Sequence, residues 1–279
     1  MIRKIALICA IFSLQFLLTK TSYAVNNQKN NLTPIQTDSN SSPTINQTQS
    51  SRKQLSSDFT RPIITLTFDD GIKTQLTNGW PIMKKYDLKG TFYIISGALD
   101  GDWYMLPENV LMLSQNGNEI AAHTVTHPDL TTLSTSQVQY ELAQSQQSLQ
   151  TLLSRPVTDF ATPYGAYNDS VIALIKQYYR SHRTAEVGYN TKINWNQYRL
   201  YSMSVMNTTT TTDISGWIAH AKKDKSWLIL DYHSIEANPT TWGTTPEQFD
   251  MQLNLIKKSG VVVKTIDQAL SELTPQFSP

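Results

Sequence analysis

The stretch Ile63–Gly71, with the sequence IITLTFDDG, decides the fold of this chain. Its first six residues are apolar or β-branched, which is typical of a strand, and Pro62 lies where a strand can begin. Asp69 and Asp70 follow at once, and two adjacent carboxylates do not continue a buried strand, because each needs its charge compensated. Gly71 permits a tight turn. The stretch therefore predicts a strand whose carboxyl end presents two acids, either to a cleft or to solvent.

Apolar runs alternate with amphipathic segments along the rest of the chain. The patterns predict strands at residues 91–95, 119–123, 159–161, 183–187, 198–205, 227–232 and 261–264. They predict helices at residues 76–86, 106–115, 134–153, 169–179, 214–223, 248–259 and 266–273. Strand and helix in alternation indicate parallel α/β layers, either a barrel or a doubly wound sheet, within a single catalytic domain at residues 59–275.

The first part of the chain has a different character. Residues 1–24 have the features of a signal peptide, with two basic residues, a short apolar run and small residues before a cleavage site at Ala24. Residues 25–58 are rich in Asn, Gln, Ser and Thr, which predicts a disordered polar linker. The single cysteine, Cys9, lies in the signal segment. We therefore expect a mature protein without disulfides, stabilised by an ordinary core.

Charge and hydropathy exclude some classes of partner. The formal net charge is +1, and removal of the signal segment takes away basic residues only. A near-neutral chain lacks the basic excess of a nucleic-acid binder. Beyond the signal segment no run is long and apolar enough to span a membrane. We expect a secreted or periplasmic monomer with no stable membrane anchor after signal cleavage.

Chemically active residues follow four of the expected strands. Asp69 and Asp70 end the first, and His123–His127 end the third. Residues 161–165 follow a later strand, and Asp231–His233 end the strand that begins at residue 227. In a parallel barrel the chemistry gathers at the carboxyl ends of the strands. We therefore expect these four segments to meet on one face.

One carboxylate and two imidazoles from these strand ends can form a metal set, with the second Asp as a base and the third His as an acid. Three protein ligands leave positions open for water and substrate, which is the pattern of a catalytic site rather than a structural one. Pro128 disfavours helical geometry at His127, so a turn after a strand is expected there. By spacing alone, one strand-end histidine beside an unrelated surface histidine remains the alternative.

The other histidines separate into two groups. His233 ends a strand and is expected to lie in the site. His182 is expected to be a connecting residue, and His220 a residue on a helix face.

Taken together, these stretches resemble the polysaccharide deacetylases of carbohydrate esterase family 4, which share the NodB homology domain. Thr67–Gly71 matches the motif T-F-D-D-G, and His123–His127 matches H-[ST]-x-x-[HD]. Pro163–Gly165 matches the end of R-x-P-Y-G, and Leu230–His233 occupies the place of the last motif. The resemblance implies a distorted (β/α) barrel of about seven parallel strands.

The resemblance also implies roles for the matched residues. Asp70, His123 and His127 would hold a divalent metal, most commonly Zn²⁺, with Co²⁺, Ni²⁺ or Mn²⁺ as alternatives. Asp69 would take a proton from the attacking water, and His233 would protonate the leaving amine. The backbone N–H of Tyr164 would help to hold the oxyanion. The expected substrate-binding residues are Pro163, Tyr164, Trp195 and Trp242, and the loop aromatics Trp103 and Tyr104 are further candidates for stacking on sugars or for ordinary packing.

Two departures from the family pattern matter. Ala161 replaces the arginine that steadies the base, and Arg183 or Arg199 is expected to supply that charge from another strand end. Asp231 stands where the family has an apolar residue. Residues two apart in a strand share a face, so Asp231 either contacts His233 and favours its charged form, or points to a backbone amide or solvent.

The sequence therefore predicts an exported, metal-dependent hydrolase that removes N-acetyl groups from a polysaccharide containing N-acetylglucosamine. Peptidoglycan, poly-N-acetylglucosamine and chitin-like polymers all satisfy this description. An O-acetyl polysaccharide esterase and a catalytically silent glycan-binding module on the same fold remain the alternatives.

Overall fold

The computed structural model describes residues 58–277. The predicted signal peptide and all of the predicted linker except Asp58 lie outside these residues. The strands are β1 (Ile63–Phe68), β2 (Thr91–Ile94), β3 (Glu119–Ala122), β4 (Asp159–Ala161), β5 (Ser181–Val187), β6 (Leu200–Ser204), β7 (Trp227–Tyr232) and β8 (Val262–Val263). The helices are α1 (Trp80–Lys85), α2 (Pro107–Gln115), α3 (Thr135–Leu153), α4 (Asp169–Tyr178), α5 (Thr211–Lys223), α6 (Pro246–Ser259) and α7 (Ile266–Leu273). A π-helical turn at Gln75–Gly79 precedes α1.

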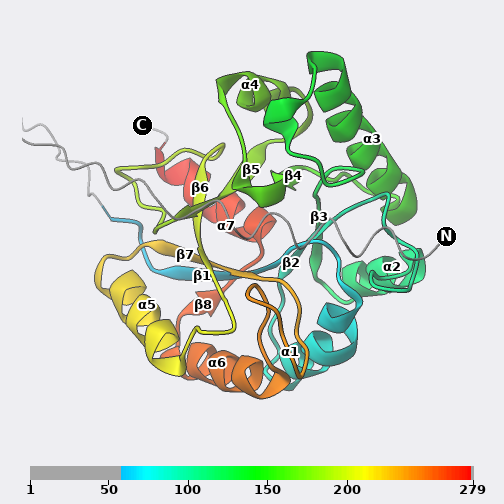
Figure 1. Ribbon diagram of the computed structural model, residues 1–279. Helices are drawn as coiled ribbons and strands as arrows, with labels where there is room; N and C mark the ends of the chain where they lie inside the picture. The colour runs from blue at the N-terminus through cyan, green and yellow to red at the C-terminus, as the bar shows by residue number, and fades with distance from the viewer. Residues whose placement is uncertain (1–57, 278–279) are drawn as a thin grey trace, which may run out of the picture. The chain divides into compact units, whose positions relative to one another are not determined.

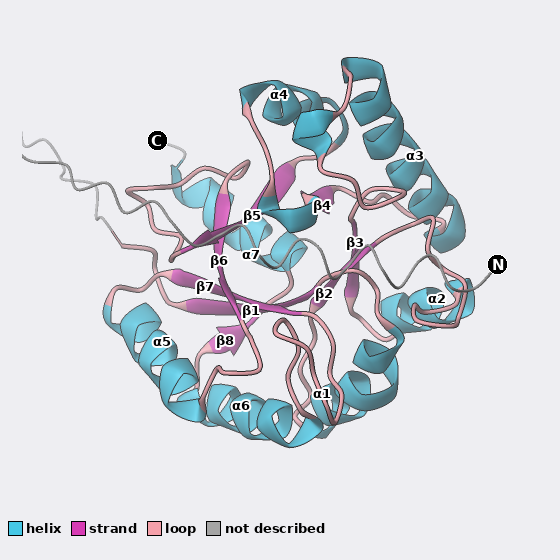
Figure 2. Cartoon of the chain, in the orientation of Figure 1, coloured by secondary structure: helices cyan, strands magenta, loops and turns pink. Residues whose placement is uncertain are grey.

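Strands β1 to β7 close into a parallel barrel, which confirms the barrel and excludes the doubly wound sheet. β1 pairs along its whole length with β7, from Ile63 beside Trp227 to Phe68 beside Tyr232. On its other edge, the second half of β1 pairs with β2 and the first half with β8. Figures 1 and 2 show the strands gathered in the centre with helices around them. All strand ends of one polarity therefore face the same side.

The local signals read from the sequence place the elements well. At α6, the Thr245 side chain accepts a hydrogen bond from the backbone of Gln248, and Gly260 ends the helix with a φ of 72°. Thr245 is therefore the N-cap and Gly260 the C-cap of the helix. The left-handed conformation of the C-cap is one that residues with a side chain adopt less readily. One assignment was wrong, because His182 is part of β5 and fully buried rather than a connecting residue. β5 pairs with β4 on one edge and with β6 on the other around this position, so His182 lies within the sheet and not in a loop.

Alternation along the strands divides the apolar residues between two cores. Ile64, Leu66 and Phe68 of β1 belong to the cluster that packs under the outer helices. The barrel interior holds a second cluster, with Ile63, Tyr93, Ala121, Ala161, Leu200, Trp227 and Ile229. Residues of α7 join this inner cluster, and the N-terminal turn of α7 bonds to the first residues of β2 and β3. Helix α7 therefore closes the N-terminal end of the barrel, and the carboxyl end is left for the site.

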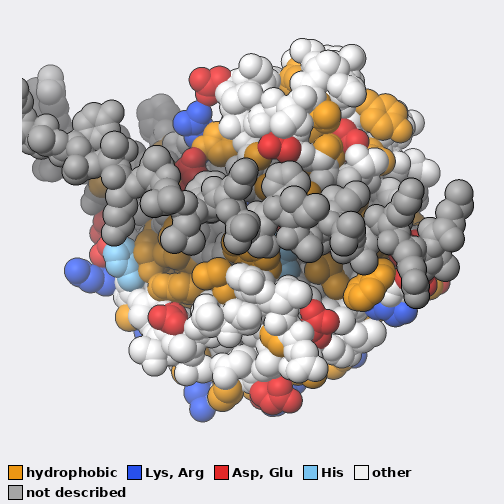
Figure 3. Space-filling view, viewed as in Figure 1, with side chains coloured by type: hydrophobic (Ala, Val, Ile, Leu, Met, Phe, Trp, Pro, Cys, Tyr) orange, Lys and Arg blue, Asp and Glu red, His pale blue; other side chains and the backbone are white. Residues whose placement is uncertain are grey.

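The surface of the described residues is unremarkable in charge. On the uncovered part of the face in Figure 3, acidic and basic side chains lie scattered rather than in a patch of one sign. Among residues 58–277, the helices are all too short or too polar to cross a bilayer.

Candidate active site

The barrel brings the predicted residues together at its carboxyl end. Asp69, Asp70, His123, His127, Asp231 and His233 line a single pocket of about 300 Å³. Period-two alternation explains why several of them point inward, because residues two apart in a strand face the same side. Along β3 the inward positions run from Ala121 to His123, and along β7 they run from Ile229 through Asp231 to His233.

Asp70, His123 and His127 form a candidate metal site. Asp70 Oδ1 lies 3.5 Å from His123 Nε2 and 3.3 Å from His127 Nε2, and the three ligand atoms fall within 4.8 Å of one another. His123 Nδ1 lies 2.8 Å from the carbonyl oxygen of Ala161. Because a carbonyl only accepts, Nδ1 carries a proton, which leaves Nε2 as the nitrogen that can bind a metal. This set of donors fits a divalent ion that prefers nitrogen and oxygen ligands, such as zinc.

The electrostatics of this set favour charged groups. Burial alone would raise the pKa of Asp70, but the imidazoles of His123 and His127 outweigh it and hold the pKa well below its usual range. Burial alone would lower the pKa of His123, and its contact with Asp70 raises it instead. The carboxylate therefore stays ionised at neutral pH, as a metal ligand must.

Backbone strain is concentrated at this end of the barrel. Asp70, Thr124, His127 and Tyr164 adopt positive φ angles of 75°, 67°, 59° and 59°. Each such conformation costs a side-chain-bearing residue roughly 1–3 kcal/mol and persists only where the surroundings enforce it. The concentration of strain in segments that carry ligands is a mark of a functional site.

Glu141 of α3 holds the strained loop that carries His127. Its carboxylate accepts hydrogen bonds from the backbone N–H groups of Val125 at 2.7 Å and Thr126 at 3.0 Å, and from the Thr126 hydroxyl at 2.6 Å. The polar spacing along α3 predicts a solvent-facing position for Glu141, whereas the residue is only 6% exposed. One signal was available, since Glu141 is the only charged residue in α3.

Arg183 occupies the centre of the site. It donates a hydrogen bond to Asp69 Oδ2, and its Nη1 lies 3.5 Å from Asp231 Oδ2. Arg183 stands directly beside Ala161 in the register between β5 and β4. Arg183 on β5 therefore reaches Asp69 from a position next to Ala161. Ala161 is the position on β4 where the family motif has its arginine. Arg199, the other arginine considered, instead pairs with Asp169 at the surface.

Arg183 and burial act in opposite directions on the two acids. Burial alone would raise the pKa of Asp69, but the Arg183 guanidinium and the imidazoles of His123 and His233 together outweigh it and lower the pKa below its ordinary value. Burial dominates at Asp231 and raises its pKa to about 6 despite Arg183. Two neighbouring carboxyls thus differ in their affinity for a proton, which is a common feature of acid–base sites.

Several polar atoms of the site are left without partners. Asp69 Oδ1, Asp231 Oδ1 and His233 Nδ1 are buried and make no hydrogen bond. Asp69, Asp231 and His233 also each offer one atom that could bind a metal ion, and these three atoms lie within 4.8 Å of one another. Buried polar atoms are rarely left unsatisfied without a reason. These groups are available to a bound water or substrate.

The expected substrate-binding residues are not all at the pocket. Tyr164 is 72% exposed, and its ring lies 4.6 Å from that of His127. Trp242 lies beside His233, with ring centroids 6.0 Å apart, whereas Pro163 is buried in the turn before Tyr164. Trp195 is not brought to the site. It packs on Trp227, the first residue of β7, and so lies toward the opposite end of the barrel.

The two remaining histidines have structural surroundings. His182 is buried, and its ring lies 2.9 Å from the Thr162 hydroxyl. Burial lowers its pKa to about 3, which keeps the ring neutral. His220 lies on α5, as expected, and pairs with Asp224 at 3.2 Å on the surface.

Comparison with known proteins agrees with this geometry. A family model described as polysaccharide deacetylase matches residues 56–180. The peptidoglycan-N-acetylmuramic acid deacetylase of Bacillus subtilis is 30% identical over 125 residues, which are 44% of this chain and 26% of that protein. A chitooligosaccharide deacetylase of Rhizobium leguminosarum bv. trifolii is 26% identical over 39% of this chain and 50% of its own length. The chain thus spans half or less of these relatives.

Solved structures share the architecture. The esterase-family-4 domain of a multidomain xylanase from the hindgut metagenome of Trinervitermes trinervoides superposes with a TM-score of 0.57 at 21% identity, covering 76% of this chain and 91% of that one. A Streptococcus pyogenes deacetylase in complex with acetate gives a TM-score of 0.51 at 26% identity, covering 54% of this chain and 67% of the other. The fold is therefore the one that the sequence motifs implied.

Proposed function

Because the chain belongs to the polysaccharide deacetylase family, we propose that it is an exported metal-dependent hydrolase that removes N-acetyl groups from a polysaccharide containing N-acetylglucosamine. One observation carries the proposal: the Asp70–His123–His127 set lies in the same pocket as a buried acid, Asp69, and a histidine, His233. The relatives named for peptidoglycan and chitooligosaccharides support an amino-sugar polymer as substrate.

Asp70, His123 and His127 are the residues that would hold the metal. A divalent ion bound there supplies a Lewis acid, which polarises the acetyl carbonyl and lowers the pKa of water. Asp69 accepts a proton from the attacking water. Its carboxylate is ionised and fixed in place by Arg183, so it is available as a base at neutral pH.

His233 completes the reaction from the other side of the pocket. As the imidazolium it donates a proton to the nitrogen of the amide, the C–N bond breaks, and acetate and a free amine are released. Asp231 offers a carboxylate oxygen within 4.8 Å of a ring nitrogen of His233, so it is placed to orient the imidazole. The backbone N–H of Tyr164, which the positive φ of that residue orients, would stabilise charge on the carbonyl oxygen.

Product analysis tests this function. The purified, zinc-loaded protein is incubated with peptidoglycan, poly-N-acetylglucosamine, a chitin oligosaccharide and O-acetylated xylan, and both acetate and new free amines are measured. We expect equal amounts of acetate and amine from at least one amino-sugar polymer. Acetate without amine would identify an O-acetyl esterase, and no acetate from any of these substrates would identify a silent binding module.

A further inference from the structure

A buried glutamine, Gln75, lies behind the two strand ends that carry Asp69 and His233. Its side chain is fully buried, and it begins the π-helical turn at Gln75–Gly79. Such turns are rare in proteins and occur frequently at functional sites. Gln75 does not line the catalytic pocket, so any effect that it has on the reaction acts through the residues that it contacts.

The side-chain amide of Gln75 joins these two strand ends. Its Nε2 donates one hydrogen bond to the backbone oxygen of Asp69 at 2.5 Å and another to the backbone oxygen of His233 at 3.2 Å. The amide oxygen, Oε1, is buried without a partner, and leaving a buried acceptor unsatisfied costs free energy. The reverse orientation would set that oxygen against two carbonyl oxygens, so the two donated bonds determine how the amide lies.

These two bonds take over where the pairing of β1 with β7 stops. The register runs as far as Phe68 beside Tyr232, and the Asp69 N–H still donates to the Tyr232 oxygen at 2.9 Å. The next residue on each strand, Asp69 or His233, has its backbone oxygen bonded by Gln75. The separation of the two backbones at this point therefore depends on one side chain.

Adjacent residues hold the segment that follows His233. The Ile235 N–H donates to Thr74 Oγ1 at 3.2 Å, and Asn78 Nδ2 donates to the Ile235 oxygen at 2.7 Å. At Gly79 a Cβ would lie 2.5 Å from Ile235 Cδ1, so the turn packs directly on this side chain. The π-helical turn thus holds the chain at His233 and again two residues later.

We propose that Gln75 is a positioning residue that fixes His233, the acid of the proposed reaction, relative to Asp69, the base. The proposal rests on the proposed function. His233 Nδ1 has no hydrogen-bond partner, so the ring is not fixed through that atom, and its place depends on the backbone that Gln75 holds. An acid must lie within hydrogen-bond reach of the group that it protonates, and a displacement of about 1 Å can cost about a hundredfold in rate.

Two substrates with different leaving groups separate this role from a structural one. A chitin-type oligosaccharide loses an amine, which must be protonated as the C–N bond breaks. para-Nitrophenyl acetate carries the same acetyl group but loses a stable phenolate, which needs no proton from an acid. With zinc saturating, Gln75→Met should lower kcat for the oligosaccharide about 10- to 100-fold with little change in KM. The kcat for the aryl ester should stay within about twofold of the wild-type value, because its reaction does not use His233.

Gln252→Met is the matched control. Gln252 of α6 is also fully buried, and both polar atoms of its side chain lack hydrogen-bond partners. The same substitution there frees no strand end, so both substrates should react as with the wild type. Asn78→Ala frees only the Ile235 oxygen and should lower kcat for the oligosaccharide alone, by about threefold. This variant decides the matter if Gln75→Met does not fold.

Equal falls for the two substrates, or no fall for either, would overturn the positioning role. A crystal structure of Gln75→Met gives a readout without turnover. The backbone oxygens of Asp69 and His233 should lie farther apart in it than in the wild type, and an unchanged separation would also overturn the role. Acetate from the aryl ester but none from any amino-sugar polymer, with the wild type, would overturn the proposed function, and the crystallographic separation then decides whether Gln75 places His233.

Discussion

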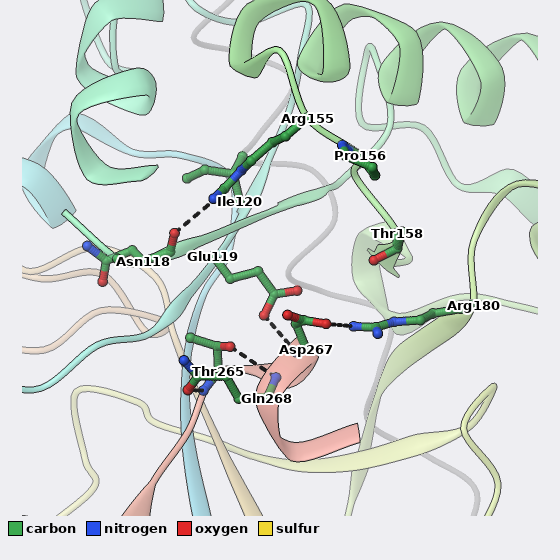
Figure 4. Close-up of a pocket in the computed structure, with 11 residues that line it drawn as sticks. Asn118, Glu119, Ile120, Arg155, Pro156, Thr158, Arg180, Thr265, Asp267 and Gln268 are labelled. Atoms are coloured by element: carbon green, nitrogen blue, oxygen red, sulfur yellow. Dashed lines mark hydrogen bonds and ion pairs between the residues drawn. The ribbon is translucent and has the colours of Figure 1, made fainter. Parts of the chain in front are cut away.

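Both ends of the barrel contain a cluster of buried charge, and the two clusters are built differently. At the N-terminal end, Asp159 accepts hydrogen bonds from Arg180 at 2.7 Å and from Ser181 at 2.6 Å. Arg180 also pairs with Asp267 at 2.6 Å, and Glu119 accepts a hydrogen bond from the Asp267 backbone at 2.9 Å. Figure 4 shows Glu119 and Arg180 of this cluster beside Asp267 at the start of α7. At the carboxyl end, by contrast, Asp69, Asp70, Asp231 and His233 retain buried atoms without partners.

The comparison teaches that hollow size does not identify the site. The hollow at the N-terminal end has a volume of about 390 Å³, and the catalytic pocket has about 300 Å³. The charges around the first are bonded to one another and to the backbone of α7, so they hold the barrel closed. In the pocket at the carboxyl end, Asp69 and Asp231 each contact Arg183 through Oδ2, and their Oδ1 atoms have no hydrogen-bond partner. Between these two hollows, the buried Asp and His atoms without hydrogen-bond partners, rather than the volume, single out the pocket at the carboxyl end.

The largest expected effect is at the metal set. Asp70→Ala and His127→Ala should each lower acetate release roughly a thousandfold, because several kcal/mol of transition-state stabilisation depend on the metal. Unfolding of the metal-free protein should change little, since removal of Asp70 also removes a buried charge. Steady-state acetate assays with urea unfolding on the same samples check both. Full activity in either variant would contradict the proposal that the metal set at the carboxyl end of the barrel carries the activity.

Asp159→Ala should lower the stability of the fold and leave catalysis unchanged. It removes the buried acceptor of Ser181 and one of the two acids paired with Arg180, so we expect a loss of about 1–3 kcal/mol in the free energy of unfolding, with kcat unchanged in the folded protein. The urea midpoint and the kcat of the variant are the measurements. A wild-type urea midpoint together with impaired catalysis would mean that the N-terminal cluster has a functional role.

Arg183→Met should lower both activity and stability, each by less than the variants above. Without the guanidinium the pKa of Asp69 rises, and a base must be deprotonated to act. The acidic limb of the kcat/KM profile should therefore move to higher pH by about one unit or more. Arg183→Lys should restore part of this shift, because it keeps the charge without the planar fork. Arg199→Met, which breaks a surface pair, is the control. An acidic limb that stays in place in Arg183→Met would refute the assigned link to Asp69.

Glu141→Gln should have the smallest effect. The amide still accepts hydrogen bonds but loses the charge, so the loop before His127 is held less firmly. We expect zinc affinity to fall about 10- to 100-fold, as is common for groups that orient metal ligands. Isothermal titration with zinc measures this, and Gln147→Ala on the same helix is the control. Unaltered affinity in both Glu141→Gln and Glu141→Ala would show that Glu141 serves the fold alone.

Much of the fold was predictable because it depends on local signals. Apolar periodicity, Thr and Ser caps and glycine C-caps lie within a few residues of the ends they fix, as at Thr245 and Gly260 of α6. The candidate metal set was predictable for a related reason. Strand ends are local features, and a parallel barrel places all of them on one face.

What the sequence left open or misplaced depends on contacts made across the fold. Arg183 and Arg199 were equivalent in the sequence, and only the register that places Arg183 beside Ala161 separates them. Glu141 has the spacing of a solvent-facing residue, but its partners are backbone amides of a strained loop. Trp195 looked like a loop aromatic, and its packing against Phe59 and Phe277 joins three segments that are distant from one another along the chain. None of these contacts has a local signature.

The most direct test is to locate zinc crystallographically. Crystals of the protein grown with Zn²⁺ and measured at the zinc absorption edge should give an anomalous peak about 2.0–2.2 Å from Asp70 and from Nε2 of His123 and His127. The same map should be empty at the N-terminal cluster around Glu119 and Asp159. A zinc peak in that cluster with none beside Asp70 would contradict the account.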